Sequence, residues 1–197
     1  MPKLLYQGHG SFRLTKNDGA VVYIDPYAGD GYDLPADVIL VTHQHMDHNK
    51  TDLITRKPGC VLITEKEALA GNKHNVFSPC GLIIEAVEAG YNKGHQPDNS
   101  VGYIVSIDGL KLYFCGDTSK TPQMSEFAAK KLDYAFLCAD GHYNMGLAEA
   151  AECAKIIGAR RNVPVHLKPG ALFDRGLAEQ FDAPGRFIIE AGEEIEL

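Results

Sequence analysis

Hydrophobic and polar residues alternate in short blocks along the first third of the chain, a pattern typical of β-strands. The strands predicted there are residues 3–7, 11–16, 20–25, 37–42 and 60–64. The fourth of them, DVILVT at residues 37–42, is almost entirely apolar, as expected of a strand buried on both faces. The segment EKEALAGN at residues 65–72 predicts a short helix that ends at Gly71.

The rest of the chain adds longer helical segments to this pattern. The further predicted strands are residues 81–89, 100–107, 110–115, 132–138 and 162–166. The first of these is also compatible with a helix. The predicted helices are residues 121–131, 146–161 and 175–181, and the apolar segment 186–190 lies near the end. Thr121 is the expected N-cap of the first of these helices, with Pro122 at its first position.

The alternation of strands and helices predicts a layered α/β fold in which two sheets pack on each other with helices outside, and connectivity alone does not separate this from other α/β folds. The best helix, residues 146–161, has one apolar stripe formed by Leu147, Ala150, Ala151, Ala154 and Ile157. No low-complexity segment or flexible linker interrupts the pattern, so we expect residues 1–197 to form a single domain.

Composition and charge restrict the classes of function. Hydrophobic residues make up 45% of the chain and charged residues 23%, as in ordinary water-soluble globular proteins. The formal net charge of −7 argues against a nucleic-acid polymer as partner. No apolar run predicts a signal peptide or a membrane span, and the five cysteines are scattered and odd in number. We therefore expect a cytoplasmic protein with reduced cysteines.

The most unusual stretch is VTHQHMDHNK, which begins with the last two residues of the buried strand at residues 37–42. It places His43, His45, Asp47 and His48 within six positions. Imidazole nitrogens and carboxylate oxygens are ligands that zinc, manganese and iron accept. Because four ligands this close in sequence cannot easily all bind one ion, we expect two adjacent ions that need further ligands from elsewhere.

Three residues at other predicted strand boundaries could supply those ligands. His95 lies in a turn-rich segment before one strand, Asp117 directly follows another, and His166 ends a third. Each alone would be an ordinary loop, turn or cap residue. Together with the histidine cluster they place metal-binding groups at four strand ends, where a rigid scaffold usually presents chemistry.

The motifs THQHMDH, His95, CGDT and PVH, in this order, resemble the metallo-β-lactamase superfamily over nearly the whole chain. The segments GHGSFRL, VVYIDPY, YNKGH and GHYNMGLAEAAE are similar to its small metal-dependent hydrolases, a branch that includes ascorbate-6-phosphate lactonase. The resemblance implies a four-layer αββα sandwich with a dinuclear centre at one edge. By the same resemblance the ligands are His43, His45 and His95 for one ion, Asp47, His48 and His166 for the other, and Asp117 between them.

Residue 45 helps to distinguish the type of chemistry. The diiron flavoproteins of the superfamily resemble the pattern H-x-E-x-D-H, whereas this chain has His45 in place of the glutamate. This difference favours hydrolysis over redox chemistry. We expect two divalent ions, with zinc as the first candidate and manganese or iron as alternatives.

The expected function is hydrolysis of a small-molecule ester, lactone or phosphodiester by a hydroxide shared between the two ions, which Asp47 could orient. One alternative is a nuclease or phosphodiesterase that acts on nucleotides. Another is a metal-binding sensor without catalytic activity. The expected partner is a small-molecule substrate, which could carry an anionic group. We expect neither a nucleic-acid polymer nor a membrane as a partner. Relatives in the branch often self-associate, so a homo-oligomer is a further expectation.

Several other residues have both a functional and a structural interpretation. Asp25 resembles the family's aspartate that supports a metal-bound histidine, but it could equally be a turn residue before Pro26. His9, between two glycines, could lie near the site or be a structural loop residue. The remaining candidates for substrate or anion contacts, which could also be ordinary surface residues, are His142, Asn144, Lys93 and Lys168.

Overall fold

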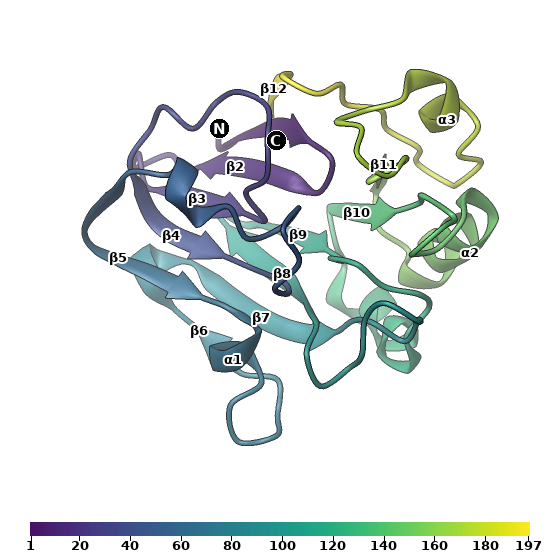
Figure 1. Cartoon of the computed structure of the whole chain (residues 1–197), viewed down its shortest axis with the longest axis horizontal. Helices are drawn as coiled ribbons and strands as arrows, with labels where there is room; N and C mark the ends of the chain where they lie inside the picture. Colours follow the sequence, from purple (N-terminus) through teal and green to yellow (C-terminus); the bar gives the residue numbers. More distant parts are fainter.

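The computed structural model describes residues 1–197 and contains two six-stranded sheets that pack face to face (Figure 1). The first sheet has the order β12 (Glu194–Glu196), β1 (Lys3–Gly8), β2 (Ser11–Thr15), β3 (Val21–Ile24), β4 (Ala36–Leu40) and β5 (Arg56–Ile63). The second has the order β11 (Arg161–Val165), β10 (Tyr134–Cys138), β9 (Leu110–Phe114), β8 (Val101–Ile107), β7 (Ile83–Glu88) and β6 (Val76–Phe77).

The two sheets repeat one pairing scheme. In the first sheet β1, β2 and β3 pair antiparallel, and β4 and β5 then add in parallel to β3. In the second sheet β7, β8 and β9 pair antiparallel, and β10 and β11 add in parallel to β9. Parallel strands end at the same edge of a sheet, so the segments after β9, β10 and β11 emerge side by side.

The main core lies between the two sheets and follows from the period-2 alternation of each strand. In β10, Tyr134 and Phe136 face this inner core, whereas Ala135 and Leu137 face the opposite side. The ring of Phe136 packs on those of Phe114 and Phe12, with centroids 4.7 and 4.8 Å away. These aromatic contacts join the two sheets directly below the strand ends that carry the functional residues.

The outer faces of the sheets are covered unequally. The second sheet packs against η3 (Pro122–Lys130), α2 (Leu147–Ile157) and α3 (Arg175–Glu179). A cluster of 21 buried residues lies between this sheet and these helices. Figure 1 shows α2 and α3 on the right, beside β10 and β11. The first sheet's outer cluster has only six buried residues, and it is covered by η1 (Thr51–Leu53) and the loop with Tyr32 and Leu34. The αββα expectation is confirmed, with a thin layer on the first sheet.

Local differences from the sequence prediction have simple causes. The segment predicted as an α-helix from Thr121 forms the 3₁₀ helix η3, and the Thr121 side chain makes no capping hydrogen bond. The best predicted helix ends at Ile157, because Gly158 adopts a left-handed conformation and the chain then enters β11. The ambiguous segment 81–89 contains the strand β7.

The short elements at the sheet edges were not predicted from sequence. β6 and β12 have two and three residues, too few to show an alternation of apolar and polar positions. The apolar segment 186–190 forms no strand and makes one bridge, between Arg186 and Asn162. The short helices α1 (Glu65–Ala68) and η2 (Pro79–Gly81) complete the elements, and no helix is long and apolar enough to cross a bilayer.

Candidate metal centre

Seven predicted ligands come together at one edge of the sandwich, where the segments after β4, β7, β9 and β11 meet. They are His43, His45, Asp47 and His48 after β4, His95 after β7, Asp117 after β9 and His166 after β11. Their ligand atoms form groups in which all atoms lie within 4.8 Å of one another. We call His43, His45 and His95 the first group, and Asp47, His48 and His166 the second group.

The first group lies partly at the surface. His45 is exposed, whereas His43 and His95 are buried. The Nδ1 atom of His45 lies 3.0 Å from Nε2 of His95, and the His43 ring centroid lies 4.7 Å from both other rings. A nitrogen of each of the three rings therefore faces a common position. Solvent can reach this position because His45 is exposed.

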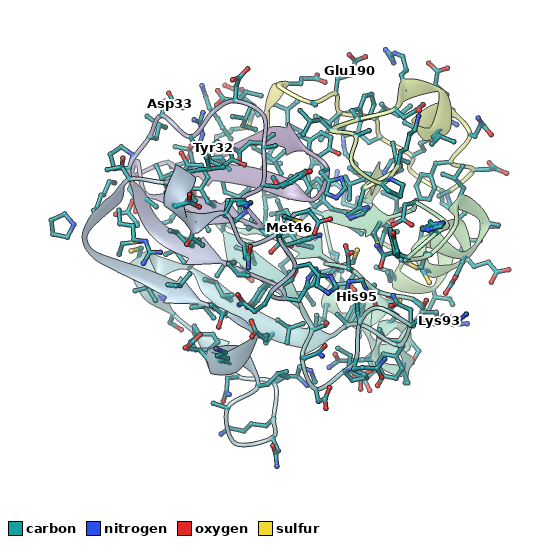
Figure 2. All side chains as sticks on the ribbon, in the orientation of Figure 1. Tyr32, Asp33, Met46, Lys93, His95 and Glu190 are labelled. Atoms are coloured by element: carbon teal, nitrogen blue, oxygen red, sulfur yellow. The ribbon has the colours of Figure 1, made fainter.

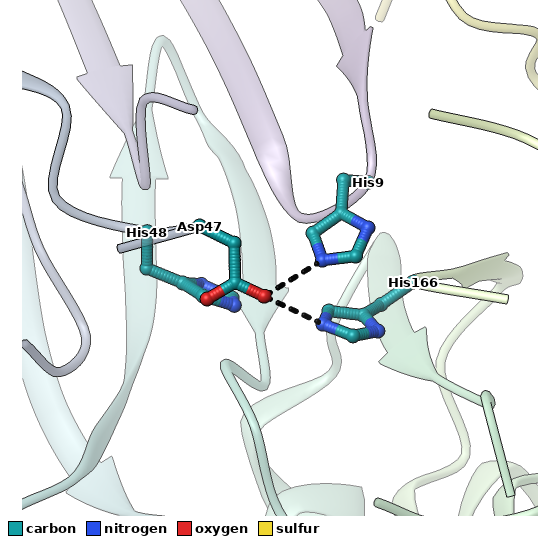
Figure 3. Close-up of side chains that lie close together, drawn as sticks. All are labelled: His9, Asp47, His48 and His166. Atoms are coloured by element: carbon teal, nitrogen blue, oxygen red, sulfur yellow. Dashed lines mark hydrogen bonds and ion pairs between the residues drawn. The ribbon is translucent and has the colours of Figure 1, made fainter. Parts of the chain in front are cut away.

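The second group is mostly buried, and Figure 3 shows its side chains close together. His48 and His166 are almost completely buried, while 32% of the Asp47 side chain is exposed. The Nε2 atom of His166 lies 3.9 Å from Oδ2 of Asp47. Asp47 is therefore the most exposed member of this group.

Asp117 lies between the two groups and faces both. Its Oδ1 atom lies 3.3 Å from Nε2 of His48 and 3.5 Å from Nε2 of His166. Its Oδ2 atom lies 3.3 Å from Nε2 of His95. Because each carboxylate oxygen faces a different group, Asp117 has the geometry of a bridging ligand for two adjacent cations.

Four of the buried or partly buried histidine rings direct Nδ1 away from the centre, toward an oxygen atom that fixes the ring. These pairs are His43 with Thr42 (3.0 Å), His48 with Asp25 (2.9 Å), His95 with Asn92 (2.9 Å) and His166 with Asp140 (3.1 Å). The Nε2 atoms are left facing the centre. This arrangement is typical of metal-binding histidines, whose second nitrogen is held by a carboxylate or another polar group.

The structure places Asp25 where the resemblance predicted it. Asp25 is buried, and its carboxylate accepts hydrogen bonds of 2.7 Å from both the backbone N–H and the hydroxyl of Thr42. The same carboxylate holds His48. Asp25 thus connects the end of β4 to the second group and is more than a turn residue before Pro26.

The unpaired polar atoms of the centre test whether a metal would fit. The buried atoms without a hydrogen-bond partner include His43 Nε2, His48 Nε2, Asp117 Oδ1 and His166 Nε2. Each such atom costs about 1–3 kcal/mol when it is left unsatisfied in the interior. All four atoms belong to predicted ligands and are of the types that bind divalent ions, so the residues present fit a metal centre.

The charge distribution also favours cations. Burial lowers the pKa of His43 well below its usual value, and His48 adds to this effect. Burial acts to lower the pKa of His48 as well, but Asp117 and Asp25 outweigh it and raise this pKa. Burial alone would raise the pKa of Asp117, yet His48 and His166 hold it well below its usual range. Asp117 is therefore ionised and supplies negative charge at the midpoint of the centre.

A chain of polar contacts that the sequence did not reveal connects the two groups. The Asp140 carboxylate, next to His166, accepts a 2.7 Å hydrogen bond from the Asn144 amide. The oxygen of Asn144 accepts from the amide of Asn92, whose own oxygen accepts from the His95 backbone N–H. Asp140 directly follows β10, as Asp117 directly follows β9, and this strand-end position was the available signal.

Replacing Asp140 by asparagine keeps the size of the side chain but removes the charge beside His166. We expect the affinity for one of two bound ions to fall about 10–100-fold, because residues that orient a metal-bound histidine contribute on this scale. Competition with a fluorescent chelator measures this affinity. The matched control is Asp98→Asn, an exposed aspartate outside the centre. Equal affinities in both variants and in the wild type would show that Asp140 does not support the metal.

An open cleft of ≈ 370 Å³ lies above the two groups. Besides the ligands it is lined by Met46, Gly94 and Tyr143. Figure 2 shows Met46 and His95 near the middle of the view, with Lys93 beyond His95. Gly94 and Tyr143 also line a neighbouring polar hollow that includes Lys93 and His142.

The remaining candidates differ in their positions. His142 is exposed in the polar hollow beside the cleft, and Asn144 is buried with Asp140. Lys168 is exposed and does not line the cleft, so the structure does not bring it into the site. His9 is completely buried and lies against Asp47 and His166.

Comparison with known proteins identifies relatives along most of the chain. A family model described as the beta-lactamase superfamily domain matches residues 3–166. A UPF0173 metal-dependent hydrolase from Thermus thermophilus is 30% identical over 84% of this chain and 84% of its own length. The UPF0173 metal-dependent hydrolase TK0141 from Thermococcus kodakarensis is 29% identical, and the alignment covers 100% of both chains.

A solved structure shares the fold. Igni18, described as a novel metallo hydrolase from the hyperthermophilic archaeon Ignicoccus hospitalis, superposes with a TM-score of 0.76. The match covers 98% of this chain and 97% of that one at 24% sequence identity. At this identity the likeness shows the architecture, which agrees with the two packed sheets described above.

Proposed function

The chain belongs to the beta-lactamase superfamily, and on this premise we propose that it is a metal-dependent hydrolase that uses two divalent ions. The observation that carries this proposal is the position of Asp117, whose two oxygens face the two ligand groups separately. A centre built for one ion would need neither the second group nor a carboxylate turned toward both.

In the proposed centre, each group of ligands would hold one ion, and Asp117 would offer one oxygen to each group. Bound divalent ions would supply Lewis acidity and lower the pKa of bound water toward about 7. Nitrogen and oxygen ligands suit zinc as the first candidate and manganese or iron as alternatives. The residues of the chain fix the positions of these ions, and the oxygens and nitrogens behind each histidine keep its ring in place.

Asp47 is the proposed catalytic residue. It is the partly exposed carboxylate of the centre and lines the cleft. From this position its carboxylate can accept a hydrogen bond from the attacking water and orient it toward the substrate. Burial alone would raise the pKa of Asp47, but the contacts with His9 and His48 outweigh it and hold the pKa below its usual value. The side chain is therefore ionised and able to accept this hydrogen bond.

The proposed substrate is a small molecule with an ester, lactone or phosphodiester bond. The cleft has the exposed apolar side chains of Met46 and Tyr143 at its rim, which suit an organic group of modest size. The adjoining hollow offers Lys93 and His142 to a carboxylate or phosphate of the substrate. Similarity of the motifs to the branch that includes ascorbate-6-phosphate lactonase supports a lactone as the first compound class to test.

Other functions have weaker support. The net charge of −7 argues against binding a nucleic-acid polymer, although a nucleotide phosphodiester is compatible with the cleft. The complete set of ligands argues against a sensor without catalytic activity. We also propose a cytoplasmic location, which the five free cysteines support, and self-association, which the resemblance to this branch implies.

Metal analysis combined with a hydrolysis panel tests the proposed function. Purified protein should hold about two ions per chain after saturation and gel filtration, and should hydrolyse at least one class among lactones, aryl esters and phosphodiesters. Dialysis against a chelator should abolish this activity, and adding zinc or manganese should restore it. Metal-saturated protein that hydrolyses none of these compound classes would contradict the proposed hydrolase activity. Less than one bound ion per chain would favour a sensor.

A further inference from the structure

His9 is the one histidine at the centre that lies outside the seven predicted ligands. It sits at the turn between β1 and β2 and is completely buried. Its φ angle of 58° lies in the left-handed region, which is uncommon for a residue with a side chain. Such a conformation persists only where the surrounding structure determines it, and it is concentrated at functional sites.

The backbone of His9 is held from two sides. Its carbonyl oxygen accepts a 2.9 Å hydrogen bond from the His166 backbone N–H and another of 2.9 Å from the hydroxyl of Tyr6. Its N–H donates to the carbonyl of Leu172. The ring also packs on that of His166, with centroids 3.6 Å apart. The positions of His9 and His166 are therefore fixed relative to each other, although the two residues are far apart in the sequence.

The ring of His9 lies between two oxygen atoms. The Nδ1 atom lies 3.0 Å from the carbonyl oxygen of Ala171. Because a carbonyl oxygen can only accept a hydrogen bond, Nδ1 carries a hydrogen, which leaves Nε2 as the nitrogen that can bind a cation. This Nε2 atom lies 3.2 Å from Oδ2 of Asp47 and within 4.8 Å of the ligand atoms of His48 and His166 (Figure 3).

His9 thus repeats the arrangement of the four oriented histidines described above. In each ring Nδ1 faces a fixed oxygen, and Nε2 faces the centre. The Nε2 atom lies 3.2 Å from Oδ2 of Asp47, and both belong to a set of four ligand atoms within 4.8 Å of one another, close enough to share one cation. We propose that His9 is an additional ligand of the second group and binds the same ion as Asp47, His48 and His166 through Nε2.

This assignment rests on the proposed function and makes the two metal positions unequal. The first group offers three histidines and one oxygen of Asp117. The second offers three histidines, Asp47 and the other oxygen of Asp117. Zinc is almost always bound by four ligands in structural sites, whereas manganese accepts six. The second position should therefore discriminate against zinc in favour of manganese or iron, relative to the first.

A metal-bound crystal structure of the wild-type chain tests the assignment without any substitution. Crystals grown with Mn²⁺ as the only added metal should show Nε2 of His9 within about 2.3 Å of the second ion. A structure in which His9 donates a hydrogen bond to Asp47 and does not touch the ion would overturn the assignment. Wild-type protein that binds no ions would overturn the proposed function as well, so the two failures are distinguishable.

Mn²⁺ titrations of variants provide the second test. His9→Phe keeps an aromatic ring against His166 and removes both nitrogens, and His9→Gln is the second variant in case the first does not fold. In whichever of these two variants folds, one Mn²⁺ should bind at least about 100-fold more weakly, while the affinity for the other Mn²⁺ should not change. The matched control is His74→Phe, a partly buried histidine outside the centre, which should bind both ions as the wild type does. Unchanged affinities in both His9 variants would overturn the assignment.

Discussion

Replacing Asp117 by asparagine is expected to lower kcat/KM for hydrolysis by more than about 1000-fold, or roughly 4 kcal/mol of transition-state stabilisation. The carboxylate has one oxygen toward each ligand group, at 3.3–3.5 Å from the histidine nitrogens. An asparagine side chain offers one neutral oxygen and an NH₂ group that repels a cation, so it cannot bind both ions. Initial rates at saturating metal, with the best substrate of the hydrolysis panel, measure this loss.

Two comparisons make the Asp117 result specific. Asp52→Asn, an exposed aspartate in η1, should retain wild-type kcat/KM because it removes the same charge far from the bridging position. Metal analysis of Asp117→Asn should show fewer than two ions per chain, while circular dichroism should show the wild-type fold. A variant that keeps two ions and more than about a tenth of the activity would show that Asp117 does not bridge the ions.

Removing the metal is expected to lower the melting temperature of the chain by about 8–16 °C. Ligand atoms of His43, His48, Asp117 and His166 are buried without hydrogen-bond partners, and bound ions would satisfy them. An ion present at 1000 times its dissociation constant stabilises the folded state by about 4 kcal/mol. For a domain of this size, each kcal/mol corresponds to about 2–4 °C. Differential scanning calorimetry before and after dialysis against a chelator measures the shift.

The melting shift has its own internal control. Adding zinc or manganese back should restore the original melting temperature, and Asp117→Asn should show a smaller shift because it binds metal less well. The same melting temperature with and without chelator, in protein shown to have lost its ions, would mean that the centre does not contribute to folding stability.

A comparison of the predicted ligands with their positions in the structure shows which residues the sequence could reveal. His43, His45, Asp47 and His48 are adjacent in the chain and follow a strand that is recognisable from its apolar run. Their joint role could therefore be inferred from spacing and ligand chemistry alone. His95, Asp117 and His166 were found because they lie at strand ends and because the order of motifs resembles a known family.

Other residues of the centre have a weaker signal or none. Asp140 and Asn92 are polar residues in turns, and their role depends on contacts with His166 and His95 that join distant parts of the chain. His9 looked like a loop residue between two glycines, and only the packing of the β1–β2 turn against the segment after β11 brings it to Asp47. Lys168 had favourable spacing from His166, but its side chain lies outside the cleft.

By itself the sequence determined most of the strands and the residue types of the centre, because these depend on local alternation and on spacing, and its resemblance to a known family indicated the sandwich. The tertiary structure alone decided that Asp117 faces both ligand groups, that Asp140 contacts His166, and that His9 lies against the second group. The physical reason is that these relations are distances between side chains on different strands. Pairing register and sheet packing set those distances, and no pattern within a single segment records them.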